Sequence, residues 1–444
     1  MCEESASFKQ IVILCSFLTL VIMHERFVHD PIHGLISFDD KTWNIIDTLH
    51  FQRLRDIHQL DVSYLIYPGA RHSRFEHSLG VGFLAEAFIR SLKQKQPELE
   101  LRHEDVEAVK LAGLCHDLGH GPFSHLFDSL FIPKVRPNIS WSHEVASELL
   151  VEDLIDKYAV DVSRSQINLI KDLIKGDVSD MERKFLFEIV ANKRNSFDVD
   201  KFDYINRDSY YIGFKDSFNY DRAFQQARVI NDQICYHKKE VFNIWELYQK
   251  RFSLFKRVYS HHTAEAIQLM IVDALVSCDS IMNFSKSIDS VEDYISFNDS
   301  VLSEISRSKN PGLKEAQDIL KRIKYRDLYK LVYETIITID DFCMEDLKKS
   351  VASMFDISDF EFVSFSINYG FKDRNPLEKF QFYDHSDINS TCNLNSLESF
   401  SMQVDFLPER FEEHIFRVFC KSGNAKISKE LQCFIQEYFS EKRA

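Results

Sequence analysis

Apolar residues recur at helical spacing along most of the first 280 residues of the chain. Glu104–Leu118 repeats them every three or four positions and ends at Gly119 and Gly121, as a helix terminus does. The same spacing predicts helices over 41–90 (interrupted at Tyr67–Gly69), 142–158, 163–175, 181–191, 200–211 and 241–282. The pattern therefore predicts a mainly α-helical fold.

Strand patterns are few and short. Arg26–Asp40 predicts two strands around a Pro/Gly turn. Near the other end, Phe360–Asn368 alternates apolar and polar residues and, with Phe380–Tyr383, predicts a hairpin. Phe416–Cys420 predicts a further strand and Ile427–Phe439 a closing helix. These elements indicate a smaller α+β lobe.

A shift toward polar composition after about residue 280 divides the chain. We expect three segments: an N-terminal apolar segment of unclear role at 1–24, a helical domain at 25–280, and a C-terminal lobe at 281–444. Within the last, the polar stretch Asp384–Ser399 is predicted to be a mobile loop.

The N-terminal segment contains a 13-residue apolar run, Ile11–Met23. A membrane-spanning helix needs about 20 such residues, so a membrane protein is not expected. Glu3 and Glu4 also spoil the positive leader of a signal peptide. A buried or irregular helix is favoured, while a signal or anchor and an unnatural start of the gene stay open.

The composition disfavours several classes of protein. Twelve Gly and nine Pro among 444 residues fall well below the usual share of about 12%, which argues against a Gly-rich phosphate loop and a turn-dense β sandwich. The formal charge of −15 argues against a protein that coats nucleic acid, because phosphate binding needs a basic face. Nine scattered cysteines without a CxxC pair indicate a reducing intracellular compartment, with nucleus and cytoplasm undecided.

Histidines are concentrated in the first third of the chain, where 12 of the 17 lie before residue 144. His116 and Asp117 stand at the end of a predicted helix, so both can turn toward one divalent ion. His77 and Asp200 complete a set of two imidazoles and two carboxylates. One such histidine alone is more often a hydrogen-bonded core residue. The ordered set favours a site for Fe, Mn, Zn or Mg with open positions for water or phosphate.

A second group of residues suits proton transfer and anion binding. It combines imidazoles with a carboxylate: His120, His125, Asp128 and His143. Three cations can meet phosphate oxygens: Arg74, Lys201 and Arg207. From the residues alone we predict hydrolysis of a phosphate ester in a small anionic substrate.

Ordered motifs extend this pattern over residues 25–440. They are Asp30–Gly34, Phe51–Arg55, Tyr67–Ala70, Arg74–Gly80, Cys115–His125, Val199–Lys201, Asn368–Gly370, Asn375–Pro376 and Arg417–Lys421. The order of His77, His116–Asp117 and Asp200 resembles the HD-domain metal-dependent phosphohydrolase superfamily. The motifs together are similar to the SAM-and-HD-domain deoxynucleoside triphosphate triphosphohydrolases, although about 24 residues before the first strand are too few for a SAM domain.

The resemblance implies that 25–280 is an HD phosphohydrolase domain with a helical core and that 281–444 is a regulatory or oligomerisation lobe. It also implies hydrolysis of a dNTP to deoxynucleoside plus inorganic triphosphate. It implies Fe, Mn or Zn held by His77, His116, Asp117 and Asp200, with Mg²⁺ on the nucleotide phosphates. Water activation or protonation of the 5′-oxygen would belong to His125, Asp128 and His143. The substrate would be bound by Gln59, Leu60, Arg74, His120, Lys201, Tyr204, Asp208 and Tyr259.

The resemblance also implies GTP and dNTP activators and a homo-oligomer, from dimer to tetramer. The matching positions are Arg26, Asp47, Gln52, Arg55, Arg222, Lys239, Asn243 and His261. Departures occur at His29, His237 and His262, where the family pattern has Asn, Arg and Lys. Histidine in place of a fixed cation predicts weaker or pH-sensitive activation.

Two alternatives stay open. One is an HD nucleotidase or phosphodiesterase of other specificity. The other is a catalytically weak paralogue that binds single-stranded nucleic acid or partner subunits, an interaction we expect to be secondary at best in view of the acidic charge.

Overall fold

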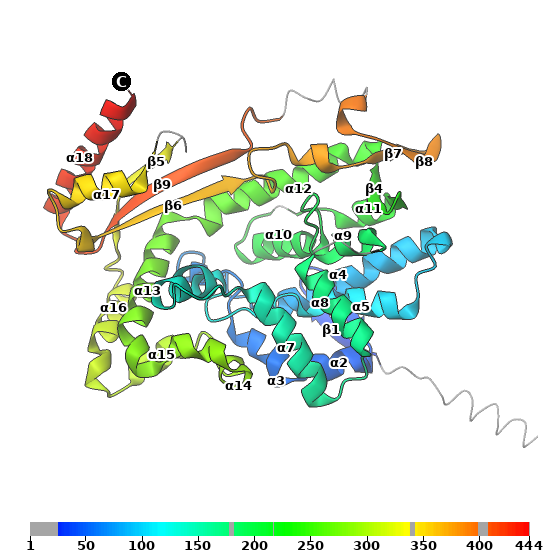
Figure 1. The fold of residues 1–444 in the computed structure, drawn as a ribbon, viewed down its shortest axis with the longest axis horizontal. Coiled ribbons are helices and arrows are strands. Elements are labelled where there is room, and N and C mark those ends of the chain that lie inside the picture. The colour runs from blue at the N-terminus through cyan, green and yellow to red at the C-terminus, as the bar shows by residue number, and fades with distance from the viewer. Residues whose placement is uncertain (1–24, 177–181, 216, 338–341, 398–406, 444) are drawn as a thin grey trace, which may run out of the picture.

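The computed structural model describes residues 25–176, 182–215, 217–337, 342–397 and 407–443. Figure 1 shows a helical body crossed on one side by a long three-stranded sheet. Helices predominate and the sheets are small, which confirms the prediction of a mainly α-helical HD core with a smaller α+β lobe.

The described chain begins with an antiparallel hairpin of β1 (Arg26–Asp30) and β2 (Gly34–Phe38). The carboxylate of Asp30 accepts hydrogen bonds from the backbone N–H groups of Ile32 and His33 at 2.8 and 2.9 Å. This closes the turn, as an Asp at this position does in many tight turns. The two predicted strands are therefore confirmed.

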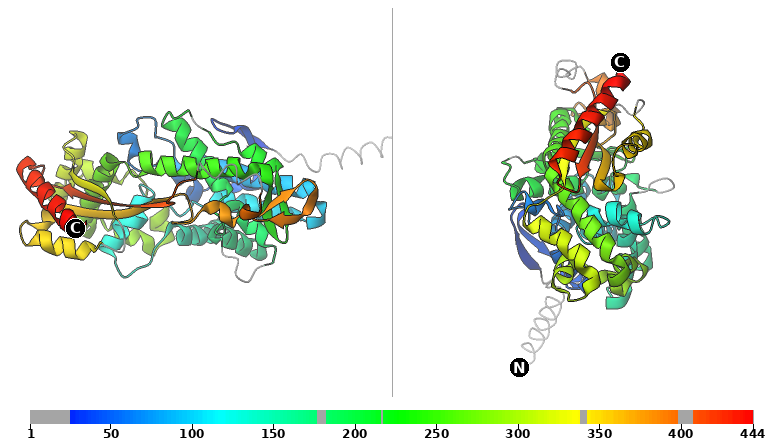
Figure 2. Two further views of the ribbon diagram at one scale, coloured as in Figure 1. Left: turned by 90° about the horizontal axis from the view of Figure 1, so that it is seen from above. Right: turned by 90° about the vertical axis from the view of Figure 1, so that its left-hand side faces the viewer.

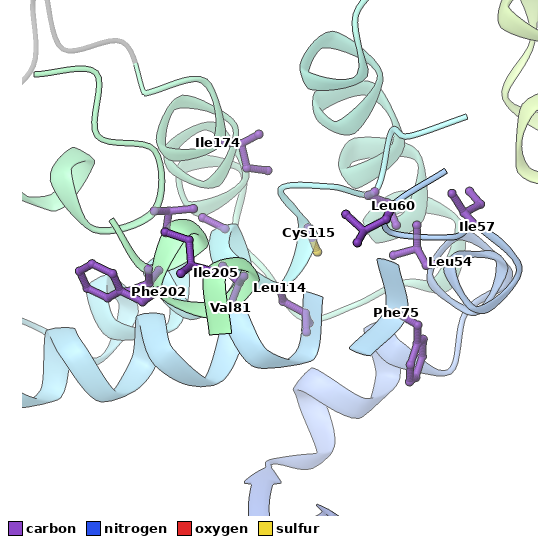
Figure 3. Packing of buried hydrophobic residues seen from close by; sticks show 14 of the residues in the cluster. Leu54, Ile57, Leu60, Phe75, Val81, Leu114, Cys115, Ile174, Phe202 and Ile205 are labelled. Carbon is purple, nitrogen blue, oxygen red and sulfur yellow. The ribbon is translucent and has the colours of Figure 1, made fainter. Parts of the chain in front are cut away.

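Three helices form the centre of the molecule: α4 (Arg74–Lys95), α5 (His103–Cys115) and α10 (Val199–Tyr211). Their facing side chains are buried, among them Val81 of α4, Leu114 of α5 and Phe202 and Ile205 of α10 (Figure 3). Burial of this apolar surface fixes the three helices against one another, and each carries part of the site described below.

The other helices of the body surround this centre. They are α2 (Asp40–Ile46), α3 (Leu49–Gln52), α6 (Ile132–Val135), α7 (His143–Tyr158), α8 (Arg164–Lys175), α9 (Phe187–Val190), α11 (Tyr220–Gln225), α12 (Val241–Leu254) and α13 (His262–Met282). The helix expected over 241–282 is interrupted. A π-helical turn at Phe255–Tyr259 follows α12, and the side chain of His261 caps α13 by accepting the N–H of Thr263.

The C-terminal part adds helices and most of the sheet structure. The helices are α14 (Val291–Ile295), α15 (Val301–Arg307), α16 (Lys314–Lys324), α17 (Met344–Ala352) and α18 (Ala425–Arg443). One sheet has the order β5 (Lys330–Ile337), β9 (Glu412–Cys420), β6 (Phe360–Asn368) and is antiparallel. The other has the order β3 (Ala227–Ile230), β4 (Gln233–His237), β7 (Phe382–Asp384), β8 (Asp387–Cys392).

Two sequence predictions for this part are wrong. The segments 360–368 and 380–383 do not form a hairpin, because β6 pairs with β9 and β7 pairs with β4 and β8. The middle of the polar stretch 384–399, expected to be a loop, is β8, whose side chains show no alternation of buried and exposed positions. Residues 398 and 399 of that stretch lie outside the described residues. Long-range pairing decided both outcomes, and local pattern does not record it.

The apolar side chains form two main clusters. The larger runs through the helical body and includes side chains of the segment 284–329. The second lies between β5, β6, β9, α17 and α18 and contains Leu347, Phe416, Leu431 and Ile435. Figures 1 and 2 show α17 and α18 at one end of the molecule. The domain boundary near residue 280 stays a prediction.

No helix in the described ranges is long and apolar enough to cross a membrane. The apolar run Ile11–Met23, on which several alternatives were left open, lies outside the described residues.

Candidate active site

A cavity of about 560 Å³ opens between α4, α10, α12 and the loop after α5. All eight residues predicted to bind the substrate line it: Gln59, Leu60, Arg74, His120, Lys201, Tyr204, Asp208 and Tyr259. Asp117, Asp200, His125 and His143 line it as well. The structure thus gathers residues from six separate stretches of sequence around one space.

Three predicted metal ligands meet, and we call them the metal cluster: His77, His116 and Asp200. Of the three, Asp200 lines the cavity. His77 lies in the first turn of α4, His116 directly follows α5, and Asp200 lies in the first turn of α10. Oδ1 of Asp200 is 3.2 Å from Nε2 of His77 and 3.5 Å from Nε2 of His116. Packing of the three helices therefore sets the spacing of the cluster.

The far nitrogen of each imidazole in the metal cluster has its own partner. Nδ1 of His77 lies 2.7 Å from Oδ2 of Asp203, and Nδ1 of His116 lies 2.8 Å from the carbonyl oxygen of Gly113. An acceptor on Nδ1 leaves the lone pair of Nε2 pointing into the site. Both rings thus present the nitrogen that a metal would need.

The chemistry of this cluster fits a divalent ion. Nε2 of His116 is buried and has no hydrogen-bond partner among the described residues. Burial opposes the charged form of Asp200, but His116 and His77 outweigh it and keep the pKa of that carboxyl low. Burial likewise opposes the charged ring of His77, while Asp200 and Asp203 raise its pKa to about 10. A site that gathers negative charge around buried imidazoles is completed by a cation.

Asp117 stands beside the metal cluster with a second partner. Its Oδ2 lies 3.4 Å from Nε2 of His77 and its Oδ1 lies 3.4 Å from Nε2 of His116. Nη1 of Arg74 also donates to Oδ2 at 2.6 Å. The predicted ligand is therefore adjacent to both imidazoles, and the predicted phosphate contact Arg74 forms an ion pair with it.

A second group, which we call the proton-transfer cluster, comprises His120, His125, Asp128 and His143. It adjoins the metal site, because Nε2 of His120 lies 3.4 Å from Oδ1 of Asp117. The rings of His120 and His143 stack with centroids 3.9 Å apart. Nδ1 of His143 is 2.6 Å from Oδ2 of Asp128. Burial opposes the charged ring of His143, but Asp128 outweighs it and raises the pKa of His143. Such a histidine can carry a proton to a leaving oxygen.

The loop that carries His120 and His125 contains two residues in the left-handed region, Phe123 and Ser124, with φ of 58° and 53°. For residues other than Gly this conformation costs of order 1–3 kcal/mol and needs support from its surroundings. Oδ1 of Asp299 accepts the N–H of Phe123 at 2.6 Å. Arg53 donates to the carbonyl oxygens of Leu118 and His120 at 2.9 and 2.7 Å.

Another part of the cavity wall offers hydrogen-bond acceptors and the ring of Tyr259. Tyr259 donates to Oδ2 of Asp208 at 2.5 Å, and Nε2 of His72 lies 2.6 Å from Oδ1 of Asp208. Oε1 of Gln59 is buried without a hydrogen-bond partner among the described residues. A hydroxyl group of a ligand can satisfy these oxygens.

The cavity wall includes residues that the sequence prediction missed: Asp61, Ser63, Ser124, Glu144, Arg251 and Phe255. Arg251 adds a cation from α12. The sequence pattern predicted a helix there but gave no sign that this residue faces a site. One predicted cation is wrong, because Arg207 does not face the cavity. It is fully buried and pairs with Asp203 and Asp30 at 2.8 and 2.9 Å.

The predicted activator residues form three separate groups. Arg26 pairs with Asp47 at 2.9 Å, and Arg55 donates to Oε1 of Gln52 at 2.8 Å. A second group surrounds Glu240, which accepts from Arg222 and Asn243 at 2.7 and 3.2 Å, with Lys239 adjacent in sequence.

The last predicted activator residue, His261, stands apart from the group around Glu240. It follows α12, whereas Lys239 precedes that helix. The 14-residue α12 spans about 20 Å. A single chain therefore does not bring the second activator set together.

Comparison with known proteins places this site in a family. The HD-domain family model matches residues 74–205. The chain is 40% identical over 451 residues to the deoxynucleoside triphosphate triphosphohydrolase SAMHD1 of Bos taurus, covering 90% of this chain and 76% of that protein. The chain belongs to this family.

Further members come from distant organisms. The human deoxynucleoside triphosphate triphosphohydrolase SAMHD1 is 38% identical over 460 residues, covering 93% of this chain and 73% of that protein. The SAMHD1 homolog of Dictyostelium discoideum is 39% identical over 404 residues, covering 89% and 77%. The family resemblance inferred from the motifs is confirmed.

Proposed function

We propose that this chain hydrolyses deoxynucleoside triphosphates to a deoxynucleoside and inorganic triphosphate. Water attacks the α-phosphorus, a new P–O bond forms, and the bond from that phosphorus to the 5′-oxygen breaks. One proton goes to the 5′-oxygen, which leaves as a hydroxyl group. The observation that carries the proposal is that Asp200 of the metal cluster lines the same cavity as Leu60 and Tyr259.

The metal cluster and the neighbouring Asp117 would hold a divalent ion. Such an ion stabilises negative charge on phosphate oxygens and lowers the pKa of a bound water. We propose Fe, Mn or Zn here, because imidazole and carboxylate together suit these metals, and Mg²⁺ on the nucleotide phosphates. His77 and His116 would bind the ion through Nε2, because their Nδ1 atoms face acceptors, and the ion would displace any proton on that nitrogen.

The proton-transfer cluster supplies the proton for the 5′-oxygen. Asp128 accepts from Nδ1 of His143 and so directs Nε2 of that ring away from itself. Burial opposes the negative charge of Asp128, but His125 and His143 outweigh it and keep the pKa of this carboxyl low. Asp128 therefore stays a carboxylate and stabilises the charged form of its partner.

The remaining wall selects the substrate. Arg74, Lys201 and Arg251 place positive charge where the phosphates would lie. Gln59 and Asp208 accept hydrogen bonds from a sugar hydroxyl group. Leu60 and Tyr259 leave little room for a 2′-hydroxyl, which favours deoxynucleotides over ribonucleotides.

Regulation and assembly form a separate part of the proposal. GTP would bind near Arg26, Asp47, Gln52 and Arg55, where a cation, a carboxylate and an amide suit a guanine edge. The second activator set requires residues from more than one copy of the chain, which supports a homo-oligomer that activators stabilise. The cysteine content favours an intracellular location.

The test is product analysis in isotopically labelled water. Purified protein is incubated with each dNTP in H₂¹⁸O, with and without GTP, in Mg²⁺ and in Mn²⁺. The proposal predicts inorganic triphosphate carrying one ¹⁸O atom and an unlabelled deoxynucleoside. Label in the nucleoside would contradict attack at phosphorus. Absence of triphosphate under all conditions, with Asp200→Ala behaving as wild type, would favour the non-enzymatic alternative.

A further inference from the structure

The turn of the N-terminal hairpin lies behind the metal cluster and has no role in the proposed reaction. Its residue His33 has a fully buried side chain. Nε2 of His33 lies 2.6 Å from Oδ1 of Asp203, and Nδ1 lies 2.8 Å from the hydroxyl of Tyr220. Both polar partners of this buried histidine come from distant parts of the sequence. Such contacts indicate that the histidine has a specific role.

Asp203 connects this turn to the metal cluster. Its side chain is fully buried, and its Oδ2 lies 2.7 Å from Nδ1 of His77. Arg207 donates to both of its oxygens at 2.8 Å, and His33 occupies Oδ1 from another side. Burial opposes the charge, but Arg207 and the histidines outweigh it and hold the pKa of Asp203 well below its usual range. Asp203 is thus an ionised acceptor in a fixed position.

Arg207, which holds Asp203, is itself held by the N-terminal hairpin. Nη1 of Arg207 pairs with Oδ2 of Asp30 at 2.9 Å, and the other oxygen of Asp30 holds the backbone of the His33 turn. The hairpin therefore contacts Asp203 through His33 and, via Asp30, through Arg207. Both routes end at the carboxylate that faces His77.

Helix α4 leaves space for this carboxylate at a glycine. A Cβ atom at Gly80 would lie 1.9 Å from Oδ1 of Asp203 and 2.6 Å from Nη2 of Arg207. Gly82, two residues later in the same helix, would meet only Leu114, at 3.2 Å. The close approach of Asp203 to α4 thus depends on one position.

We propose that Asp203, held by His33 and Arg207, is a positioning residue that fixes the ring of His77 with Nε2 directed at the metal. A carboxylate behind a metal-binding histidine sets its tautomer and orientation and raises its basicity. Asp200 and Asp203 lie one turn apart on α10, so this helix supplies both a ligand and the support of another ligand. The inference rests on the metal-binding part of the proposed function and not on the identity of the substrate.

The test measures metal affinity in variants that leave every ligand in place. Metal-stripped protein is titrated with Co²⁺, and the visible absorption of bound cobalt reports affinity and ligand geometry. The variants are Asp203→Asn, which retains an acceptor but loses the charge, and His33→Gln, which removes one support of Asp203. The matched control is His50→Gln, because His50 is also buried against a carboxylate, Asp153, at 2.7 Å.

We expect the dissociation constant for Co²⁺ to rise about 10- to 100-fold in Asp203→Asn and by a smaller factor in His33→Gln. The cobalt spectrum should change in both. His50→Gln should lower the unfolding temperature while leaving affinity and spectrum unchanged. Gly80→Ala should weaken cobalt binding because its methyl group displaces Asp203, whereas Gly82→Ala should bind as wild type.

Wild-type affinity and spectrum in His33→Gln and Gly80→Ala, together with unfolding temperatures lowered as in the control, would overturn the proposal, even where Asp203→Asn fails to fold. Failure of the proposed reaction has a different signature, since the wild type would then bind cobalt with the expected dependence on His33 but produce no triphosphate.

Discussion

Two histidine–carboxylate clusters lie side by side, one on each side of Asp117, and they differ in the partners of their imidazole rings. In the metal cluster, the Nδ1 atoms of His77 and His116 have partners outside the cavity, so both Nε2 atoms point at Asp200. In the proton-transfer cluster, Asp128 is itself occupied by Nδ1 of His143, and the side chain of His125 is 62% exposed.

This difference shows how the same residue types can have different functions when their hydrogen-bond partners differ. An imidazole whose Nδ1 atom is held by a hydrogen-bond partner and whose Nε2 atom is buried offers a fixed lone pair on Nε2, as a metal requires. An imidazole that shares its proton with a carboxylate and opens to the cavity can exchange that proton with a ligand. Ligand-like spacing occurs in both clusters, so spacing alone does not distinguish them.

The largest effect is expected from the metal cluster. Asp200→Asn removes the carboxylate oxygen that lies near both imidazoles. Loss of the ion removes several kcal/mol of transition-state stabilisation, or about a thousandfold in kcat. Elemental analysis and triphosphate release measure the two losses together. Full activity in a metal-free Asp200→Asn protein would show that the reaction does not need a metal held by this cluster.

A smaller loss is expected from the proton-transfer cluster. His143→Gln should lower kcat for dNTPs about a hundredfold, because protonation of the 5′-oxygen is lost, and should leave metal content unchanged. p-Nitrophenyl triphosphate serves as the control substrate, since nitrophenolate leaves without a proton. An equal loss of rate with both substrates would contradict the proton-transfer role.

The helices and strands of the body, and the residues of both clusters, could be predicted from the sequence because each depends on local pattern or motif. His77, His116 and Asp200 were found from residue type and order. The supports could not be found in this way. In the sequence, Asp203 looks like an ordinary polar residue of a helix. Asp299 lies more than 170 residues after the loop that it holds. Such partners are brought together by packing of distant segments, as were β6 and β9.

The sugar-side wall provides a sharper test of selectivity. Tyr259→Ala should reduce the preference for dNTPs over NTPs by roughly tenfold, the scale of one small steric contact. Tyr259→Phe loses the bond to Asp208 but keeps the ring, so the preference should persist while KM rises. The ratio of kcat/KM for dGTP and GTP as substrates measures the preference in both variants, and the steady-state rates also give KM. An unchanged ratio in Tyr259→Ala would place the exclusion of ribose elsewhere.

The smallest effect on rate is expected at Asp299, which supports the left-handed residues Phe123 and Ser124 from outside the cavity. Asp299→Asn keeps one acceptor but loses its charged hydrogen bonds with His58 and Phe123, at a cost of about 1–3 kcal/mol in stability. The loop carrying His125 should loosen, and kcat should fall less than in His143→Gln. Chemical denaturation and steady-state rates measure the two effects. Loss of bound metal in Asp299→Asn would show that the clusters are not independent.

The separation of the two clusters is tested most directly by the number of tightly bound divalent ions per chain. The measurement is elemental analysis of wild type, Asp200→Asn and His143→Gln after removal of loosely bound metal. We expect one ion per chain in wild type and in His143→Gln and none in Asp200→Asn. An ion that persists in Asp200→Asn and disappears in His143→Gln would contradict it.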